Sequence, residues 1–354
     1  MVYNPNKVIH PGYTVAKILS REGMTQKNLS ERTGLTEKHL SQIINGEASI
    51  TVETALLLEN ALGGTASFWI NLEKKYQENK ARVERISLIE KETDLVSGFP
   101  YSELAKRGYV EKTRDACKKV ENLWKFFGVN SLCFVQNTEF IAYRMKSATK
   151  VKSEAIAAWL RCGEIESKKF DLPEYSESKL KESLPIIKRL STLDSENFSE
   201  GITKALSDVG VGLVYVAHFH GTGVSGAVRW IGNNPIIQLS VLGAYSDIFW
   251  FNLYHELAHL ILHSKKDKFI EFDNKELSVS QEKEIEADKF ATDILIPERD
   301  YKKLLEGNVT RAVIMDFARN QQIHPSIVAG RLCHDKKIEW SVVSDLRPRL
   351  RIVR

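Results

Sequence analysis

The chain is poor in the residues that mark several classes of protein. Only four of its 354 residues are cysteine, and none forms a Cys-x-x-Cys pair, which argues against a disulfide framework or a cysteine zinc site. Nine prolines and 20 glycines are too few for a collagen-like or low-complexity chain. No apolar run approaches the ~18 residues of a membrane helix. Residues 1–13 lack the apolar core of a secretory signal, so we expect a cytoplasmic protein without a membrane partner.

What the chain does contain is typical of a folded protein with more than one domain. Hydrophobic residues make up 43% and charged residues 27%, which is an ordinary balance for a globular chain. A length of 354 residues is long for one domain and comfortable for two. The formal net charge is +4, which is too small to indicate nucleic-acid binding without a local cluster of charge.

Changes of character along the chain divide it into three segments. Residues 1–80 show the pattern of short helices with tight turns, and residues 81–200 are charged and mostly helical in pattern. Residues 201–354 begin with short β-branched runs, followed by helical patterns. The basic tail, residues 346–354, is expected to be mobile and solvated.

The fold class predicted from these segments is multidomain. We expect an all-α helix-turn-helix domain at the N-terminus and a helical middle region of unknown role. Residues 211–217 and 235–240 are expected strands of a small sheet of two or three strands in the C-terminal segment, with turn-rich sequence at residues 220–223 and 232–234. This segment is therefore predicted to be an α+β domain that ends in helices.

Glycines and threonines mark the helix ends of the N-terminal segment. Gly23 is expected to end a first helix, and Thr25 to cap a second. Gly34 breaks the second helix, Thr36 caps a third, and Gly46 follows its end. Two short helices joined by a turn predict a helix-turn-helix, whose apolar core is expected to contain Leu29, Leu35, Leu40 and Ile43.

The third helix carries the polar side chains expected to enter a major groove. These are Thr36, Glu37, Lys38, Ser41, Gln42 and Asn45. Gln26 and Lys27, at the start of the second helix, are expected at the phosphate backbone. The geometry alone leaves open a small helical bundle that docks onto a protein, because a fold does not establish a function.

Residues 10–76 resemble the HigA-type branch of the Cro/C1-repressor-like family. The segments that carry the resemblance are His10-Pro11-Gly12, Met24 to Leu29, Gly34-Leu35-Thr36, Ile43 to Gly46, Ile50 to Ala55 and Ala61 to Leu72. The resemblance implies a homodimer that binds a palindromic double-stranded DNA operator, often as an antitoxin with a cognate toxin. Phe68 and Trp69 are expected to be core or dimer residues.

The sharpest chemical signal is the motif His255-Glu256-Leu257-Ala258-His259 within an apolar helical run. Residues four apart share a helix face, so His255 and His259 can bind one metal ion. Glu256 can then act as the general base towards a metal-activated water, as in zinc peptidases. Apolar flanks predict that the helix is buried, and buried histidines need polar partners or a metal.

A catalytic zinc site needs a third protein ligand, which we expect from the acidic run at residues 282–291. Glu284 is the favoured ligand, and Asp288, four residues later, is expected to hydrogen-bond a ligand histidine. Glu286 is the competing candidate; it lies ~200° around the helix from Glu284, so both cannot point at the metal. His263 follows His259 by four residues and is expected to lie outside the ligand set.

Residues 205–335 resemble the ImmA/IrrE family of zinc-dependent peptidases. The segments that carry this resemblance are Gly212 to Val216, Gly226, Pro235 to Ser240, His255 to His259, Glu284 to Ala291, Leu295-Ile296-Pro297 and Phe317 to Leu332. The resemblance implies a zincin-like metallopeptidase that acts on one specific protein, such as a repressor.

Two functions from different classes follow from these patterns. The first is a DNA-binding transcriptional regulator with a zinc-dependent endopeptidase domain, in which Glu256 stands between intact ligands. The second is an antitoxin-like repressor whose metal domain is structural or sensory and does not turn over. A His/His/Glu site also accepts divalent ions other than zinc.

Overall fold

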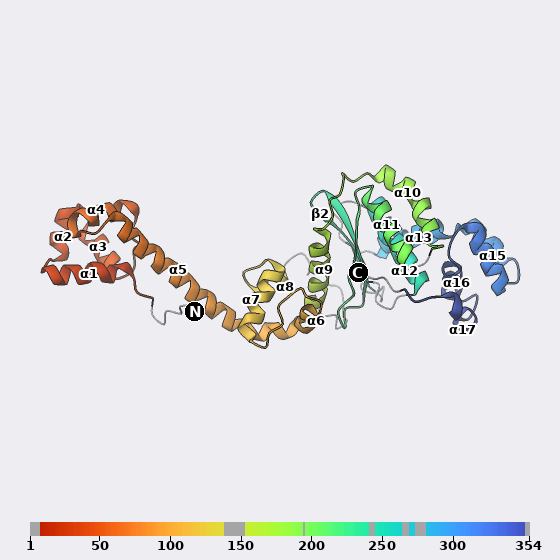
Figure 1. Cartoon of the computed structure of the whole chain (residues 1–354), viewed down its shortest axis with the longest axis horizontal. Helices are drawn as coiled ribbons and strands as arrows, with labels where there is room; N and C mark the ends of the chain where they lie inside the picture. Colours follow the sequence, from red (N-terminus) through yellow and green to blue (C-terminus); the bar gives the residue numbers. More distant parts are fainter. Residues whose placement is uncertain are drawn as a thin grey trace. The chain divides into compact units, whose positions relative to one another are not determined.

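The computed structural model describes residues 8–137, 153–193, 195–240, 245–263, 269–272 and 281–350. The chain divides into two compact units, Met1–Thr93 and Asp94–Arg354, which are described separately (Figure 1). None of the helices in the described residues combines the length and the apolar character that a membrane span requires.

The N-terminal unit is helical, as the sequence predicts. Its described residues form α1 (Pro11–Glu22), α2 (Gln26–Thr33), α3 (Glu37–Ile44), α4 (Val52–Leu62) and α5 (Ala66–Lys91). Gly23 and Gly34 follow α1 and α2 with φ of 63° and 73°, the left-handed conformation that favours glycine. The side chains of Thr25 and Thr36 accept hydrogen bonds from the backbone N–H groups of Asn28 and His39. The predicted caps and stops of the helix-turn-helix are therefore confirmed.

A close backbone approach fixes α1 against α3 in this unit. A Cβ atom added at Gly12 would lie 1.9 Å from the carbonyl oxygen of Ile43, so only glycine allows this contact. Of the predicted core, Leu29, Leu40 and Ile43 are fully buried, and Leu35 is partly buried against them. Trp69 is also buried, whereas the neighbouring Phe68 is exposed.

The C-terminal unit contains most of the helices. Before its sheet the chain forms η1 (Thr93–Gly98), α6 (Tyr101–Lys106), α7 (Ala116–Phe127), α8 (Leu132–Asn137), α9 (Ser153–Ser167), α10 (Glu177–Leu190) and α11 (Ser195–Ser207). After the first three strands it forms α12 (Ser246–Leu262), α13 (Gln281–Leu295), α14 (Glu298–Leu305), α15 (Arg311–Gln321), α16 (Pro325–His334), α17 (Trp340–Val343) and η5 (Ser344–Leu346).

Within the described residues of this unit, four strands form one sheet, in the order β1-β3-β2-β4. They are β1 (Gly212–Tyr215), β2 (Val224–Ile231), β3 (Asn234–Leu239) and β4 (Phe269–Phe272). β1 runs parallel to β3, whereas β2 is antiparallel to both β3 and β4. The multidomain fold, with helices at the N-terminus and a small sheet in the C-terminal part, is confirmed.

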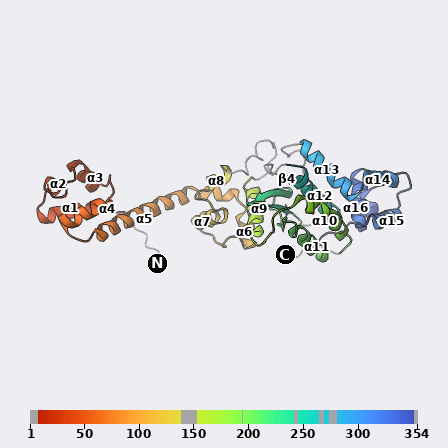
Figure 2. The ribbon, with the colours of Figure 1, turned by 90° about the horizontal axis from the view of Figure 1, so that it is seen from above.

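The sheet lies between α9 and α12, as Figures 1 and 2 show from two directions. Alternation along β3 explains this layering, because successive residues point to opposite faces. Ile237 and Leu239 belong to the large core that contains Leu257 of α12. Gln238, between them, donates from Nε2 to the carbonyl oxygen of Trp159 in α9, over 2.7 Å. Both faces of the sheet are therefore buried.

The expected division at residues 80 and 200 stays a prediction about domain organisation. In the structure, α5 continues past residue 80 to Lys91. α9, which lies in the expected middle region, packs against β1 and β3. This packing gives part of the middle region a structural role next to the sheet.

The expectation of a solvated tail is wrong for residues 346–350. The guanidinium group of Arg347 donates to the Asp247 carboxylate over 2.9 and 2.7 Å, and it stacks on the rings of Trp340 and Tyr245. The backbone N–H of Ser246 donates to the carbonyl oxygen of Pro348. Asp247 is buried and needs a charged partner, which this part of the tail supplies. The rest of the predicted tail, residues 351–354, lies outside the described residues.

Candidate metal centre

The two motif histidines project from one face of α12, and the helix is buried along most of its length. His255 is 1% exposed, Glu256 0% and His259 3%. The Nε2 atoms of the two imidazoles lie 2.9 Å apart. The i, i+4 spacing of the motif thus brings two nitrogen ligands together in the protein interior.

α13 supplies the carboxylate at this point. Oε2 of Glu284 lies 3.0 Å from Nε2 of His255 and 3.7 Å from Nε2 of His259. One ligand atom from each of these three residues lies within 4.8 Å of the others, and within the described part of the chain they form the one such group. The structure thus places Glu284 with the histidines, whereas Glu286 contacts His263 over 3.2 Å.

Asp288 holds His255 from its other side. Its Oδ1 atom lies 3.0 Å from Nδ1 of His255. A carboxylate can only accept a hydrogen bond, so Nδ1 carries a proton, and in the neutral form of the ring Nε2 presents a lone pair to Glu284. Two acceptors then face each other at 3.0 Å, an arrangement that a cation between them would stabilise. The donor set therefore fits a divalent metal ion.

The protonation states of the donors also suit metal binding. Burial is the main cause that lowers the pKa of His259, to about 4, so its ring is neutral near pH 7. Burial alone would raise the pKa of Glu284, but contacts with the imidazoles of His255 and His259 lower it well below its ordinary range. Neutral imidazole and ionised carboxylate are the forms that ligate zinc.

The Glu256 side chain is fully buried and lies against the sheet. A Cβ atom added at Gly226 of β2 would lie 2.0 Å from Oε1 of Glu256. The pairing of β2 with β4 shifts register between Val224 and Gly226, which marks a β-bulge at this point. In the sequence, Gly226 stands out only as part of a family resemblance, and its contact with Glu256 becomes visible only in the folded structure.

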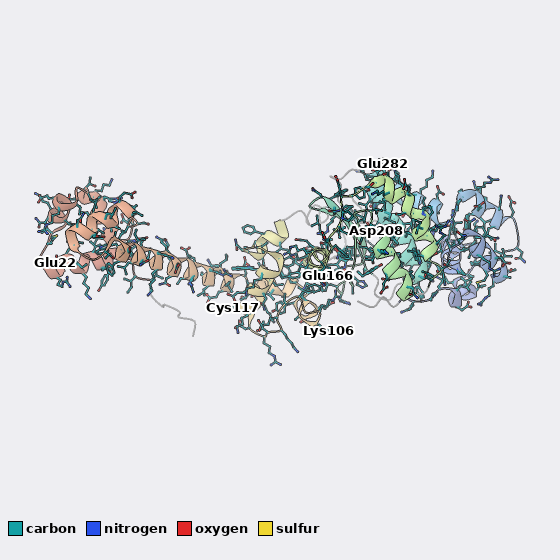
Figure 3. The ribbon with its side chains drawn as sticks, turned by 45° about the horizontal axis from the view of Figure 1, so that its top comes forward. Glu22, Lys106, Cys117, Glu166, Asp208 and Glu282 are labelled. Atoms are coloured by element: carbon teal, nitrogen blue, oxygen red, sulfur yellow. The ribbon has the colours of Figure 1, made fainter. Side chains whose placement is uncertain are left out.

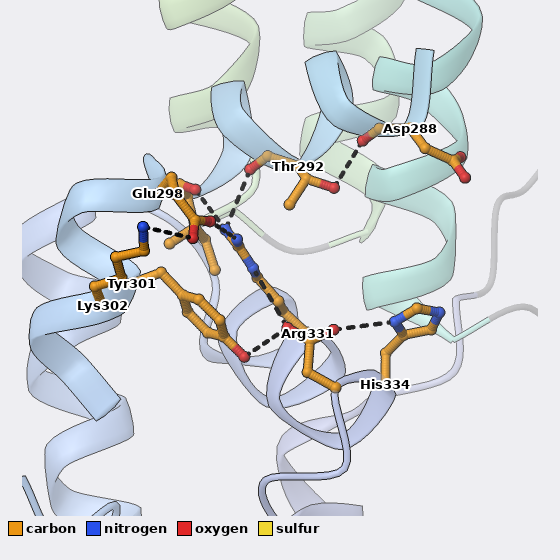
Figure 4. Close-up of polar contacts among 9 residues, drawn as sticks. Asp288, Thr292, Glu298, Tyr301, Lys302, Arg331 and His334 are labelled. Atoms are coloured by element: carbon orange, nitrogen blue, oxygen red, sulfur yellow. Dashed lines mark hydrogen bonds and ion pairs between the residues drawn. The ribbon is translucent and has the colours of Figure 1, made fainter. Parts of the chain in front are cut away.

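A second set of contacts anchors the end of α13 beyond Asp288 (Figure 4). Arg331 of α16 donates to the carbonyl oxygen of Ile296 and pairs with Glu298 over 2.7 Å. Its guanidinium group lies over the ring of Tyr301, 3.8 Å from the centroid. These contacts fix the helix that carries Glu284 against α14 and α16.

The expected DNA-reading residues lie on or beside α2 and α3. Gln26, Lys27, Thr36, Glu37, Lys38 and Asn45 are exposed, and Ser41 and Gln42 are half-buried. The hydroxyl of Thr36 caps α3, and the amide of Asn45 donates to Ser41 over 3.3 Å. These two side chains therefore also have local structural partners.

Comparison with known families finds a match for each of the two segments that resemble a family in sequence. Residues 16–69 match the family model described as helix-turn-helix, and residues 214–328 match that described as the IrrE N-terminal-like domain. The second match contains His255, His259 and Glu284. No curated protein matches the chain at a comparable significance.

The solved structures that are similar to a part of the chain include two antidote proteins. One is an addiction module antidote protein of the HigA family from Coxiella burnetii, at 34% identity and a TM-score of 0.23. That match covers 24% of this chain and 95% of the other. The second, described as an antidote protein of a plasmid maintenance system from Nostoc punctiforme PCC 73102, is 33% identical with a TM-score of 0.20. It covers 23% of this chain and 96% of the other.

The contact between Gly226 and Glu256 predicts a coupling between the two residues. Gly226→Ala should lower the free energy of unfolding by about 1–3 kcal/mol, because the added methyl group overlaps the carboxylate. In a Glu256→Ala background the same change should cost much less, since the overlapping atoms are gone. Chemical denaturation of the four proteins measures this cycle.

Gly307→Ala is the matched control for this cycle, since no atom lies within 4 Å of a Cβ added there. It should change the stability little in either background. An equal cost of Gly226→Ala with and without the Glu256 carboxylate would contradict the contact.

Proposed function

We propose that this chain, which joins a helix-turn-helix segment to an IrrE N-terminal-like domain, is a DNA-binding regulator with a metal-dependent endopeptidase site. The observation that carries the proposal is the convergence of His255, His259 and Glu284, with Glu256 next to the first histidine. A purely structural site needs neither an adjacent carboxylate nor an open coordination position.

On this proposal His255, His259 and Glu284 would hold a zinc ion, which would supply Lewis acidity towards a peptide carbonyl and water. Two imidazoles and one carboxylate are a common ligand set for catalytic zinc. Asp288 keeps the His255 ring in the tautomer that leaves Nε2 available for the ion.

Glu256 performs the proton transfers in this mechanism. One of its carboxylate oxygens accepts a proton from the water that attacks the carbonyl carbon. As the bond from carbon to nitrogen breaks, the same oxygen returns the proton to the leaving amine. The packing of Glu256 against Gly226 holds the carboxylate in one place and limits the reorganisation that these steps require.

The substrate on this proposal is one specific protein: this protein itself, a repressor or a cognate toxin. The helix-turn-helix unit would bind a palindromic double-stranded operator as a homodimer, with α3 in the major groove. Lys38 is exposed and suited to a phosphate, whereas the Gln42 amide is suited to a base edge.

Glu256→Gln should strongly slow cleavage and keep the metal. The amide has the shape of the carboxylate but accepts no proton, so we expect a loss of about 100-fold or more in rate. Mass-spectrometric mapping of new protein N-termini, in cells that express either form, would reveal the cleaved protein. New termini should depend on Glu256, while the metal content of the two purified proteins is equal.

Glu306→Gln is the control for this experiment, because it makes the same chemical change at an exposed residue of the C-terminal unit. It should leave the termini unchanged. Equal sets of termini with wild type and Glu256→Gln would favour the alternative function, an antitoxin-like repressor whose metal domain is structural or sensory and cleaves no protein.

The proposed DNA binding by the helix-turn-helix unit is tested separately. Lys38→Ala should weaken binding to all duplexes and reduce the dependence of log Kd on log salt by about one ion, because a phosphate contact is lost. Gln42→Ala should cost about 1–3 kcal/mol and relax the preference at one base pair. Fluorescence anisotropy, with a duplex selected by the wild-type protein from a random library, measures both.

Lys303→Ala serves as a charge-matched control, since this exposed lysine lies on α14 of the C-terminal unit. Unchanged binding by the Lys38 and Gln42 variants would show that α3 is not the recognition helix.

A further inference from the structure

A chain of hydrogen bonds leads from the candidate metal ligand His259 to the protein surface. Nδ1 of His259 lies 3.0 Å from Nδ1 of His263, one helical turn further along α12. Nε2 of His263 lies 3.2 Å from Oε2 of Glu286 on α13. The His263 side chain is only 3% exposed, whereas that of Glu286 is 64% exposed. The chain therefore links a buried imidazole to a carboxylate that contacts solvent.

The positions of the protons in this chain follow from its last member. A carboxylate only accepts hydrogen bonds, so Nε2 of His263 carries the proton that points to Glu286. Nδ1 of a neutral His263 is then a lone pair, and it can only accept from Nδ1 of His259. His259 is thereby held with its proton on Nδ1 and its Nε2 lone pair facing His255 and Glu284.

The two candidate ligand histidines are thus held by acidic residues in different ways. Asp288 contacts Nδ1 of His255 directly, whereas Glu286 reaches Nδ1 of His259 through His263. Both arrangements present Nε2 to the same point, which is the requirement for two nitrogen ligands to one ion. Glu286, the competing candidate from the sequence, has a place in this arrangement that does not require it to touch the ion.

We propose that His263 and Glu286 are positioning residues, which set the tautomer and the ring orientation of His259 through this hydrogen-bonded chain. The inference rests on the proposed metal site, because His259 is its ligand there. Partners of this kind typically contribute about 10–100-fold to metal affinity.

Zinc affinity of the full-length protein, measured by competition with a chromophoric chelator, tests the proposal. His263→Leu has a side chain of similar size but no acceptor, so the affinity should fall about 10–100-fold. His263→Asn keeps an acceptor close to the position of Nδ1 and should recover part of that loss. Recovery by Asn over Leu separates a hydrogen-bonding role from one of packing.

Glu286→Ala should also weaken zinc binding, and by less than His263→Leu, because water can replace an exposed carboxylate as acceptor. Because Glu286 is exposed, Glu286→Ala should not impair folding, so it tests the proposal even if His263→Leu does. Glu282→Ala is the matched control on the same helix, since Glu282 is exposed. Figure 3 labels this residue. The control should leave the affinity unchanged.

A spectroscopic measurement on the metal-free protein is independent of zinc. Nitrogen-15 NMR of the histidine rings near pH 7 should show a proton on Nε2 of His263 and on Nδ1 of His259. A wild-type protein that binds zinc, with equal affinity in the His263 and Glu286 variants, would overturn the positioning role alone. A wild type that binds no zinc would overturn the proposed metal site, while opposite tautomers in the NMR spectrum would overturn the inference.

Discussion

The packing of α12 against the sheet is the interaction on which the rest of the C-terminal unit depends. Burial removes the side chains of His255, Glu256 and His259 from water, so each requires a polar or ionic partner. For the two histidines, α13 and α12 itself supply these partners. Where Glu256 meets the sheet, the strand carries a glycine, Gly226, and no larger residue would leave room for the carboxylate.

The ligands are placed by contacts that extend well beyond the site. Arg331 of α16 donates to the carbonyl oxygen of Ile296, the residue that follows α13, and contacts Glu298 and Tyr301 of α14, so the end of the helix that carries Glu284 and Asp288 is held between α14 and α16. At the other end, Arg347 pairs with Asp247 in the first turn of α12. Both helices of the site are therefore secured by arginines from the last part of the chain, and this bracing favours a preformed geometry over one assembled by the ligand.

Local rules predicted what depends on neighbours in sequence. The caps at Thr25 and Thr36, the glycine stops and the shared face of His255 and His259 all follow from helix geometry. The same geometry favoured Glu284, which shares a helix face with Asp288, over Glu286, which points in another direction. It did not foresee the contact of Gly226 with Glu256, the pairing of Arg347 with Asp247 or the place of α9 on the sheet. Each of these joins residues far apart in the chain, and only the packed structure brings them together.

The central claim is that His255, His259 and Glu284 bind one divalent ion, and metal content tests it most directly. Inductively coupled plasma mass spectrometry would be applied to the purified full-length protein after equilibration with zinc and removal of the excess. The account predicts one zinc per chain in the wild type and in Glu286→Gln, whose amide can still accept from His263, and a loss of zinc in Glu284→Gln. A wild type without zinc, or zinc retained by Glu284→Gln and lost from Glu286→Gln, would contradict it.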